Sequence, residues 1–392
     1  MKTLLSVKYL VILLILLGLI ALGIYIFLNS SPKTLPKIPP TSTPGTNNTT
    51  SDLQQKISGM SLRDKILSLM ILHTPGTDAK EIASFISKYH PAGVILMDDN
   101  ISNNNDQIRE LTSAIQEVSS PYPSLIAIDE EGCTVKRIPS DNFLCSEQLK
   151  SLSPKETYSA FQKRSIMLHD LGINLNFGIV ADITGNESSF IFPRVFGADP
   201  KKVSDHIVAA LQGSHPYVLS TLKHFPGHGR TSSNSHITIP DVLVSEDDWR
   251  SFDYLPFKAG IEANTEFIMF GHLNYKNVDD SPATLSSKWH SLLEKEAGFK
   301  NITITDDMIM LQKSQDPQYE DVVKNAIQAI NAGNHILLYV NDYNLVEEPV
   351  RQIDIDQLVS DIEAAVNSGE VDQIKLNISA EKVLEMRAKL PL

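Results

Sequence analysis

The amino-acid sequence predicts an α/β fold, a (β/α)8 barrel of the TIM type, preceded by an N-terminal transmembrane helix and a disordered linker. Eight short apolar runs rich in β-branched residues recur along the chain, with helical patterns between them. The runs are continuous and do not alternate with polar residues, as expected of parallel strands buried on both faces. Eight β-then-α repeats in about 300 residues fit a closed barrel better than a doubly wound open sheet, which is the structural alternative.

The first segment of the chain predicts a membrane anchor. Tyr9 to Leu28 form a run of twenty residues without a charge, about the length needed to cross a ~30 Å hydrocarbon core. Lys2 and Lys8 precede the run as in a signal peptide, but it exceeds the usual apolar region of about 7–15 residues, and no small-residue cleavage site follows. We therefore expect residues 1–28 to be an uncleaved transmembrane helix. The two lysines favour a cytoplasmic N-terminus and an extracytoplasmic domain, although two later lysines weaken this bias.

The next segment predicts a tether, and the remainder predicts one large domain. Residues 29–51 are rich in Pro, Ser, Thr and Asn and have no apolar period, which is typical of a disordered linker. Residues 52–392 contain 30 of the 34 Lys and Arg residues and all 47 Asp and Glu residues. This acidic balance argues against nucleic acid or an anionic membrane surface as a ligand of the domain. We expect the domain to be monomeric.

The predicted strands and helices alternate through the domain. The strands read SLMIL (68–72), GVILM (93–97), LIAID (125–129), INLNFGIV (173–180), VLSTLKHF (218–225), FIMFGHL (267–273), ITITDD (302–307) and HILLYV (335–340). Apolar residues at spacings of three and four predict helices within 106–116 and 320–330. Ser61 and Asp64 resemble a capping box that opens the first helix of the domain.

Polar residues stand where several predicted strands end, which is where the active sites of barrels of this type are built. They are Asp129 after the third run, Lys223 and His224 in the fifth, His272 in the sixth, and Asp306 and Asp307 in the seventh. A carboxylate and a proton donor suffice to break a glycosidic bond, and in retaining enzymes the two catalytic groups lie about 5–5.5 Å apart. Either aspartate of the seventh run could be the nucleophile, and a histidine could be the acid/base.

The segment KHFPGHGRTSSNSH, residues 223–236, is dense in ionisable groups. His224 and His228 have the i, i+4 spacing of a zinc-binding helix, but a proline and two glycines lie between or beside them, and these residues break helices. The glutamate of an HExxH motif is also missing, because Phe225 stands in its place. We therefore interpret the segment as a sharply bent loop after the fifth strand, with His228 shaping the loop.

These motifs resemble a known family. KHFPGHG followed by NSH, together with ITDDM, IDEEG and its downstream arginine, and PATLS, is similar to the family-three glycoside hydrolases. Among them, the sequence resembles the single-domain bacterial β-N-acetylhexosaminidases that act on muropeptides, from about Leu62 to the C-terminal ISAEKVLEMRAK. The β-glucosidases of the family carry a second α/β domain that supplies their acid, and this chain leaves little room for one. The resemblance therefore implies that the acid comes from a loop of the barrel.

The resemblance implies a role for each matching residue. Asp306 matches the catalytic nucleophile, His236 the general acid/base, and Asn234 the residue that holds the catalytic imidazole. Five residues match those that bind the sugar, and carboxylates, lysines and arginines make charge-assisted hydrogen bonds to hydroxyl groups. These sugar-binding residues are Asp129, Arg137, Arg194, Lys223 and His224. The resemblance implies no metal or organic cofactor.

The sequence departs from the family pattern in three places, one of which covers two residues. Asn234 stands where the family has an aspartate that pairs with the catalytic histidine, and a neutral amide stabilises an imidazolium less well. Cys133 and Thr134 replace the Gly-Arg that usually follows Glu-Gly, which adds a side chain and removes a charge. Asn301 replaces a glycine before the seventh strand, which is a mild change.

The sequence therefore leaves three functions open. The first is a retaining, exo-acting β-N-acetylhexosaminidase that removes terminal β-linked N-acetylglucosamine from cell-wall or related glycans through a glycosyl-aspartate intermediate. The second is a catalytically impaired barrel that binds glycan, which Asn234 and Thr134 favour. The third is a family-three enzyme of another specificity, a β-glucosidase or a phosphorylase.

The two cysteines also leave alternatives open. Cys133 and Cys145 are too few for a disulfide scaffold. Twelve positions apart, they could pair with each other outside the cytoplasm, or both could be free thiols.

Overall fold

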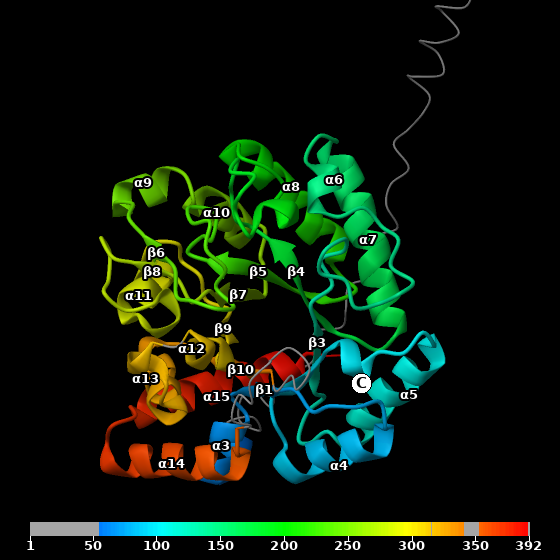
Figure 1. The fold of residues 1–392 in the computed structure, drawn as a ribbon. Coiled ribbons are helices and arrows are strands. Elements are labelled where there is room, and N and C mark those ends of the chain that lie inside the picture. Colours follow the sequence, from blue (N-terminus) through cyan, green and yellow to red (C-terminus); the bar gives the residue numbers. More distant parts are fainter. Residues whose placement is uncertain (1–54, 315, 341–352, 391–392) are drawn as a thin grey trace, which may run out of the picture. The chain divides into compact units, whose positions relative to one another are not determined.

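The computed structural model describes residues 55–314, 316–340 and 353–390, which form a closed barrel of parallel strands surrounded by helices (Figure 1). The barrel strands follow one another in chain order, and the first pairs with the last to close the barrel. They are β1 (Met70–Leu72), β2 (Gly93–Leu96), β3 (Leu125–Ile128), β4 (Leu175–Val180), β5 (Leu219–Phe225), β7 (Phe267–Phe270), β9 (Ile302–Asp307) and β10 (Ile336–Tyr339). The predicted (β/α)8 fold is confirmed, and the open sheet is excluded.

The predicted transmembrane helix (1–28) and linker (29–51) lie outside the described residues. Within the described residues, none of the helices has both the length and the apolar character needed to span a membrane.

Helices cover the outside of the barrel and complete the β-then-α repeats (Figure 1). They are α3 (Leu62–Leu67), α4 (Ala79–Tyr89), α5 (Asn105–Val118), α6 (Ser146–Leu149), α7 (Pro154–Asp170), α8 (Pro200–Ser214), α9 (Glu246–Ser251), α10 (Tyr254–Glu262), α11 (Ser287–Lys295), α12 (Ile309–Lys313), α13 (Val322–Ala332), α14 (Ile355–Ser368) and α15 (Gln373–Ala388). In the described part of the chain, short 3-10 helices lie in the connections at Asp98–Asn100, Phe192–Arg194, Ala283–Leu285 and Pro317–Tyr319. A parallel pair outside the barrel joins β6 (Asp241–Val242) to β8 (Asn274–Tyr275).

Polar caps define where many of these helices begin. The side chain of Ser61 accepts the backbone N–H of Asp64 at the start of α3, as the sequence predicts. Aspartate side chains accept backbone amides at the starts of α4, α8, α13, α14 and α15. Because each cap satisfies amides that the helix itself leaves unpaired, it stabilises its helix by about 1 kcal/mol.

Several strands are shorter than their predicted runs, whereas the fifth ends at the predicted residue. β5 ends at Phe225 because Pro226 follows and has no N–H to donate to the next strand. Lys223 and His224 therefore lie within the strand, and only the rest of the motif forms the loop. β7 ends at Phe270, so His272 lies just beyond the sixth barrel strand and not inside it.

An aromatic cluster anchors the C-terminal end of β5. The ring of Phe225 lies within 5.0–5.9 Å, between ring centroids, of four buried aromatic rings. They belong to Trp249, Phe257, Phe270 and Trp289. Aromatic pairs at these separations add to the stabilisation that burial provides. The strand end that carries Lys223 and His224 is therefore held rigidly against α9, α10 and α11.

Candidate active site

Lys223 near the end of β5 is buried between two carboxylates. Its Nζ donates to Oδ1 of Asp129 at 2.6 Å and lies 2.7 Å from Oε1 of Glu131. Burial alone would lower the pKa of Lys223, but the two carboxylates outweigh burial and raise the pKa above its ordinary 10.5. Lys223 is therefore charged, and the third hydrogen of its ammonium group remains for another acceptor.

Glu131 joins Lys223 to Arg194, which lies in the connection after β4. The guanidinium of Arg194 binds Glu131 through two contacts, Nε to Oε2 at 2.9 Å and Nη2 to Oε1 at 2.7 Å. Burial would raise the pKa of Glu131, but Arg194 and Lys223 lower it to about 2. Glu131 is not among the site residues predicted from the sequence. The sequence did offer a clue to its role. Glu131 stands two residues after Asp129, and both residues follow the C-terminal end of β3, where site residues are expected.

Asp182 is a second acid that the sequence analysis did not single out. Because Val180 pairs with Lys223 across β4 and β5, Asp182 lies beside His224. Its Oδ2 lies 2.7 Å from Nδ1 of His224, and its Oδ1 accepts the backbone N–H of His228 at 2.6 Å. The sequence offered one clue to this role, because Asp182 stands two residues after the end of a predicted strand.

The contacts of His224 define its tautomer. Nη2 of Arg194 lies 3.3 Å from Nε2 of His224, and arginine can only donate. Nε2 is therefore the acceptor, and we assign the proton to Nδ1, which donates to Asp182. Two neighbouring groups thus hold the ring of His224 in one orientation at the mouth of the barrel.

Asp306 and Asp307 end β9 and lie in different environments. Oδ1 of Asp307 accepts the backbone N–H groups of Ile309 and Val340, at 3.1 and 2.9 Å, and burial raises its pKa to about 7. Burial would also raise the pKa of Asp306. Interactions with the surrounding histidines and the hydrogen bond from the backbone N–H of Asp307 outweigh this and lower the pKa of Asp306 to about 2. Asp306 is therefore the ionised carboxylate of the pair, and Asp307 has a structural role.

Three histidines from separate elements surround Asp306: His224 on β5, His272 after β7, and His236 on the loop after β5. His272 is buried, and its Nε2 lies 2.9 Å from the carbonyl oxygen of Asp307. Its Nδ1 lies 2.9 Å from Oγ1 of Thr284, which belongs to the PATLS motif. Thr284 therefore fixes His272, and His272 in turn braces the end of β9.

The loop that carries His236 folds back on itself. Nε2 of His228 lies 3.1 Å from Oγ of Ser235, and this contact joins the two ends of the loop. Gly229 has no side chain where the loop crosses Ile183, since a Cβ atom there would lie 1.8 Å from the Ile183 carbonyl oxygen. His228 shapes the loop, as the sequence analysis predicts.

Asn234 is placed differently from its predicted role. We expected its side chain to hold the imidazole of His236, but its Oδ1 accepts the backbone N–H of His236 at 2.9 Å. The carbonyl oxygen of Asn234 also accepts the amides of Ile237 and Thr238. A side chain that closes a local turn on the backbone two residues later is typical of Asn, and it leaves the imidazole without this partner.

His236 and Asp306 lie close enough for each group to shift the pKa of the other. The His236 side chain is exposed, yet neighbouring groups exclude enough water that partial burial lowers its pKa below 6.5, against the opposing effect of Asp306. The ring of Phe190 lies 5.5 Å from the His236 ring, between centroids, in an edge-to-face arrangement. A neutral imidazole thus lies near an ionised carboxylate, two kinds of group that can carry a proton and act as a nucleophile.

Arg137 lies apart from the cluster of Lys223, Arg194 and Glu131. Its Nη1 pairs with Oδ2 of Asp98 at 2.7 Å, in the connection after β2. Among the described residues, no hydrogen bond links the Arg137 side chain to Asp129. The structure thus brings Asp129, Lys223, Arg194 and His224 together through direct contacts or through Glu131, and it places Arg137 beside the neighbouring connection.

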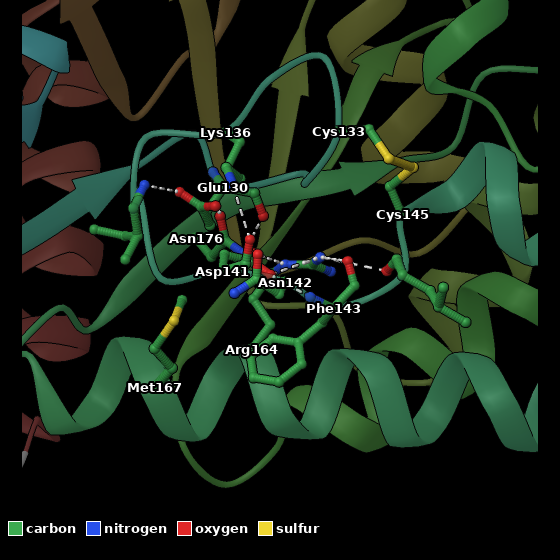
Figure 2. A network of polar contacts seen from close by, with 12 residues as sticks. Glu130, Cys133, Lys136, Asp141, Asn142, Phe143, Cys145, Arg164, Met167 and Asn176 are labelled. Atoms are coloured by element: carbon green, nitrogen blue, oxygen red, sulfur yellow. Dashed lines mark hydrogen bonds and ion pairs between the residues drawn. A yellow bond between two sulfur atoms is a disulfide. The ribbon is translucent and has the colours of Figure 1, made fainter.

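A buried polar network supports the segment that carries Asp129, Glu131 and Arg137 (Figure 2). Oε2 of Glu130 accepts the backbone N–H groups of Arg137 and Ile138, both at 2.8 Å. Burial and a hydrogen bond shared with Asp141 raise the pKa of Glu130 to about 8. Glu130 is therefore protonated at neutral pH and links the start of the segment to its later part.

Arg164 and a disulfide fix the other end of the segment. Figure 2 shows Arg164 extending from α7 toward Asp141, and its Nε lies 2.6 Å from Oδ2 of Asp141. Cys133 and Cys145 form a disulfide, which decides between the two alternatives that the sequence left open. Cys133 has a left-handed φ of 49° in a tight turn, and Thr134 beside it is exposed. The departure from Gly-Arg thus creates a covalent tie at the edge of the site.

The zinc interpretation of the histidine-rich loop finds no geometric support, because His224 and His228 use their ring nitrogens on Asp182 and Ser235. In the described part of the chain, no group of three or more His, Cys, Asp and Glu side chains is arranged to hold a metal ion.

Comparison with known proteins adds independent evidence. Residues 61–386 match the glycosyl hydrolase family 3 N-terminal domain. β-Hexosaminidase A of Pseudoalteromonas piscicida is 31% identical over 341 residues, which cover 79% of this chain and 55% of that protein. The β-hexosaminidase of Nitrosomonas eutropha is 30% identical over 302 residues, which cover 72% of this chain and 83% of that protein.

The fold comparison agrees with the sequence comparison. A glycoside hydrolase family 3 β-N-acetylglucosaminidase from Paenibacillus has a TM-score of 0.76 at 26% identity, covering 83% of this chain and 62% of that one. The chain thus spans little more than half the length of the Pseudoalteromonas and Paenibacillus proteins.

Proposed function

This chain belongs to glycosyl hydrolase family 3, and on that premise we propose that it is a retaining, exo-acting β-N-acetylhexosaminidase. The observation that carries the proposal is the position of an ionised Asp306 at the end of β9, facing His236 on the loop after β5. Two relatives that match along most of this chain are named β-hexosaminidases, which supports the choice of sugar.

In the proposed reaction, a carboxylate oxygen of Asp306 attacks the anomeric carbon of the terminal sugar. The bond to the leaving oxygen breaks, and protonated His236 donates its proton to that oxygen, which gives a glycosyl-aspartate and a free alcohol. Neutral His236 then takes a proton from a water molecule that attacks the same carbon and releases Asp306. Two displacements on one carbon preserve its configuration.

The residues around Asp306 suit the hydroxyl groups of one sugar ring. Asp129 offers carboxylate oxygens as acceptors, while Lys223 and Arg194 offer charged donors held in place by Glu131. Asp182 holds the proton of His224 on Nδ1, so Nε2 accepts from Arg194 and helps to fix that guanidinium in the pocket. Arg137 would have to leave Asp98 in order to reach the sugar, so we assign it to the edge of the site.

The test is hydrolysis of 4-nitrophenyl N-acetyl-β-glucosaminide by the purified chain, without added phosphate. We expect release of 4-nitrophenol, loss of at least about 10³-fold in kcat for Asp306→Ala, and weak turnover of the corresponding glucoside. Turnover equal to that of Asp306→Ala on both substrates would favour the glycan-binding alternative. Turnover that depends on phosphate would favour a phosphorylase.

Asn234 allows a second test of the catalytic loop. Its side chain is engaged with the backbone of His236, and aspartate can accept the same N–H. We therefore expect Asn234→Asp to change kcat by less than about tenfold, which is measured with the same nitrophenyl substrate. A gain of 100-fold or more would mean that the native loop is impaired and would favour the binding function.

We further propose that residues 1–28 anchor the chain to a membrane, with the barrel facing cell-wall glycan outside the cytoplasm. The support is the uncharged run from Tyr9 to Leu28 and the disulfide, which persists in oxidising compartments. Fractionation of cells that express the full chain tests this. Recovery of the full chain in the soluble cytoplasmic fraction would contradict it.

A further inference from the structure

The loop that carries His236 is tied to the connection after β4. Oγ of Ser189 donates to the carbonyl oxygen of Thr231 at 2.8 Å, and Ser189 is buried. The next residue, Phe190, places its ring 5.5 Å from that of His236 and 6.0 Å from that of His228, between centroids. A hydrogen bond and two ring contacts thus join two segments about forty positions apart in the chain.

Other restraints on the His236 ring are few. The side chain of Asn234 is engaged with the backbone N–H of His236, and the ring forms no hydrogen bond to any described residue. Its aromatic contact is with Phe190. A ring on an exposed loop without a hydrogen-bonding partner samples several rotamers unless a packing contact selects one.

We infer that Phe190 is the positioning residue for the catalytic imidazole of His236, and that Ser189 latches the two loops so that this contact forms. The inference rests on the proposed function, in which His236 is the acid/base. The edge-to-face contact selects the ring orientation in which His236 faces Asp306, so the aromatic ring takes over a task that the Asn234 side chain does not perform.

The same contact also affects the protonation of His236. Phe190 shields one side of the imidazole from water, which supports the burial that lowers its pKa. Four charged or titratable groups act on the ring, namely Asp306 on β9, Arg194 in the connection after β4, His224 on β5 and Lys313 on α12. Asp306 opposes the lowering and the other three add to it. Removing Phe190 also removes the ring over which the Arg194 guanidinium lies at 5.8 Å, but Glu131 still holds Arg194 through two contacts, so the main change at His236 is the access of water.

The test compares Phe190→Leu with Phe192→Leu as a matched control. Phe192 belongs to the same connection, but its ring contacts Lys150 and not a histidine. Two substrates are used, 4-nitrophenyl N-acetyl-β-glucosaminide, whose leaving group needs little protonation, and chitobiose, whose leaving group needs an acid. We expect Phe190→Leu to lower kcat/KM on chitobiose by roughly 10- to 100-fold, and on the nitrophenyl substrate by much less.

The pH profile is the second readout. An acid that must be protonated gives a limb on which kcat/KM falls as pH rises through its pKa. We expect this limb below pH 6.5 in the wild type and at a higher pH in Phe190→Leu, because water regains access to the ring. Phe190→Tyr should return the pH at which kcat/KM falls to the wild-type value. Ser189→Ala should show the same two changes as Phe190→Leu, with a smaller loss of kcat/KM and a smaller shift in pH.

The outcomes are distinct. Equal losses on both substrates with an unmoved limb, as expected of a purely structural defect, would overturn the inference, and so would wild-type values. If Phe190→Leu fails to fold, Ser189→Ala carries the test with the same two readouts, and its wild-type behaviour would overturn the inference. If His236→Ala keeps wild-type kcat/KM on chitobiose, the proposed function fails as well. Inactive His236→Ala beside unaffected Phe190→Leu refutes the positioning role alone.

Discussion

Glu131→Gln is the substitution whose effect follows most directly from the geometry of the site. Glu131 is buried, and it contacts both Arg194 and Lys223 within 2.9 Å. Its pKa falls from an ordinary 4.5 to about 2. At about 1.4 kcal/mol for each tenfold change in proton affinity, this corresponds to about 3 kcal/mol in favour of the charged form. Gln keeps the shape, removes the charge, and places an –NH2 group where one carboxylate oxygen had accepted from a buried cation.

The sign of the pH dependence follows from the lowered pKa. A carboxyl group with a depressed pKa in the folded protein contributes its full stabilisation above its unfolded pKa, near 4.5, and loses it as pH falls toward 2. We therefore expect Glu131→Gln to lower the free energy of unfolding by about 3 kcal/mol at pH 7 and by less at pH 3. Breaking one partner of a buried ion pair elsewhere costs about 3–5 kcal/mol, which agrees in size.

The assay is urea unfolding of wild type and variant at both pH values. Glu117→Gln on the exposed side of α5 is the matched control, and it should change the free energy of unfolding by less than about 0.5 kcal/mol. A loss below about 1 kcal/mol for Glu131→Gln at pH 7 would refute the reasoning. Equal losses at pH 7 and pH 3 would refute the electrostatic origin.

Two further predictions concern the segment after β3. Replacing Cys133 and Cys145 with serine opens a loop whose ends lie 12 positions apart, and the chain-entropy relation gives a loss of about 3 kcal/mol in the free energy of unfolding, which urea titration measures; a loss below about 1 kcal/mol would contradict it. Burial and the contact with Asp141 raise the pKa of Glu130 to about 8. Protonated Glu130 therefore contributes stability that is fully present below pH 4.5 and is lost as pH rises toward 8. Glu130→Gln should therefore reduce the fall in stability between pH 5 and pH 9, and a fall as steep as that of the wild type would disprove this.

The strands were predictable from the sequence because buried parallel strands need continuous apolar runs, and eight such runs are present. The N-cap of Ser61 was predictable for a similar reason, since it depends on residues only three positions apart. The resemblance to a family led to Asp306 and Lys223, which stand at strand ends. These features depend on local pattern, and local pattern is present in one sequence.

The pairings across the barrel were not predictable in the same way. Asp182 and Glu131 differ from other acids of the chain only in what the closed barrel brings next to them, namely His224 and Arg194. From the sequence, the side chain of Asn234 could contact either the imidazole or the backbone of His236. In the folded chain it accepts the backbone N–H of His236 in a local turn. The contact of Phe190 with His236 depends on two loops that meet only in the folded chain.

The central claim is that Asp306 attacks the sugar and becomes covalently bound to it. With a ring-fluorinated N-acetylglucosaminyl fluoride, whose glycosyl-enzyme is hydrolysed slowly, this intermediate should accumulate on the enzyme. Acid quenching, proteolysis and mass spectrometry then locate the modified residue. We predict a single adduct on the peptide that contains Ile302–Asp307, assigned to Asp306 by fragmentation and missing from Asp306→Ala. Turnover of nitrophenyl substrate without any adduct on this peptide, or an adduct on another carboxylate, would contradict the account.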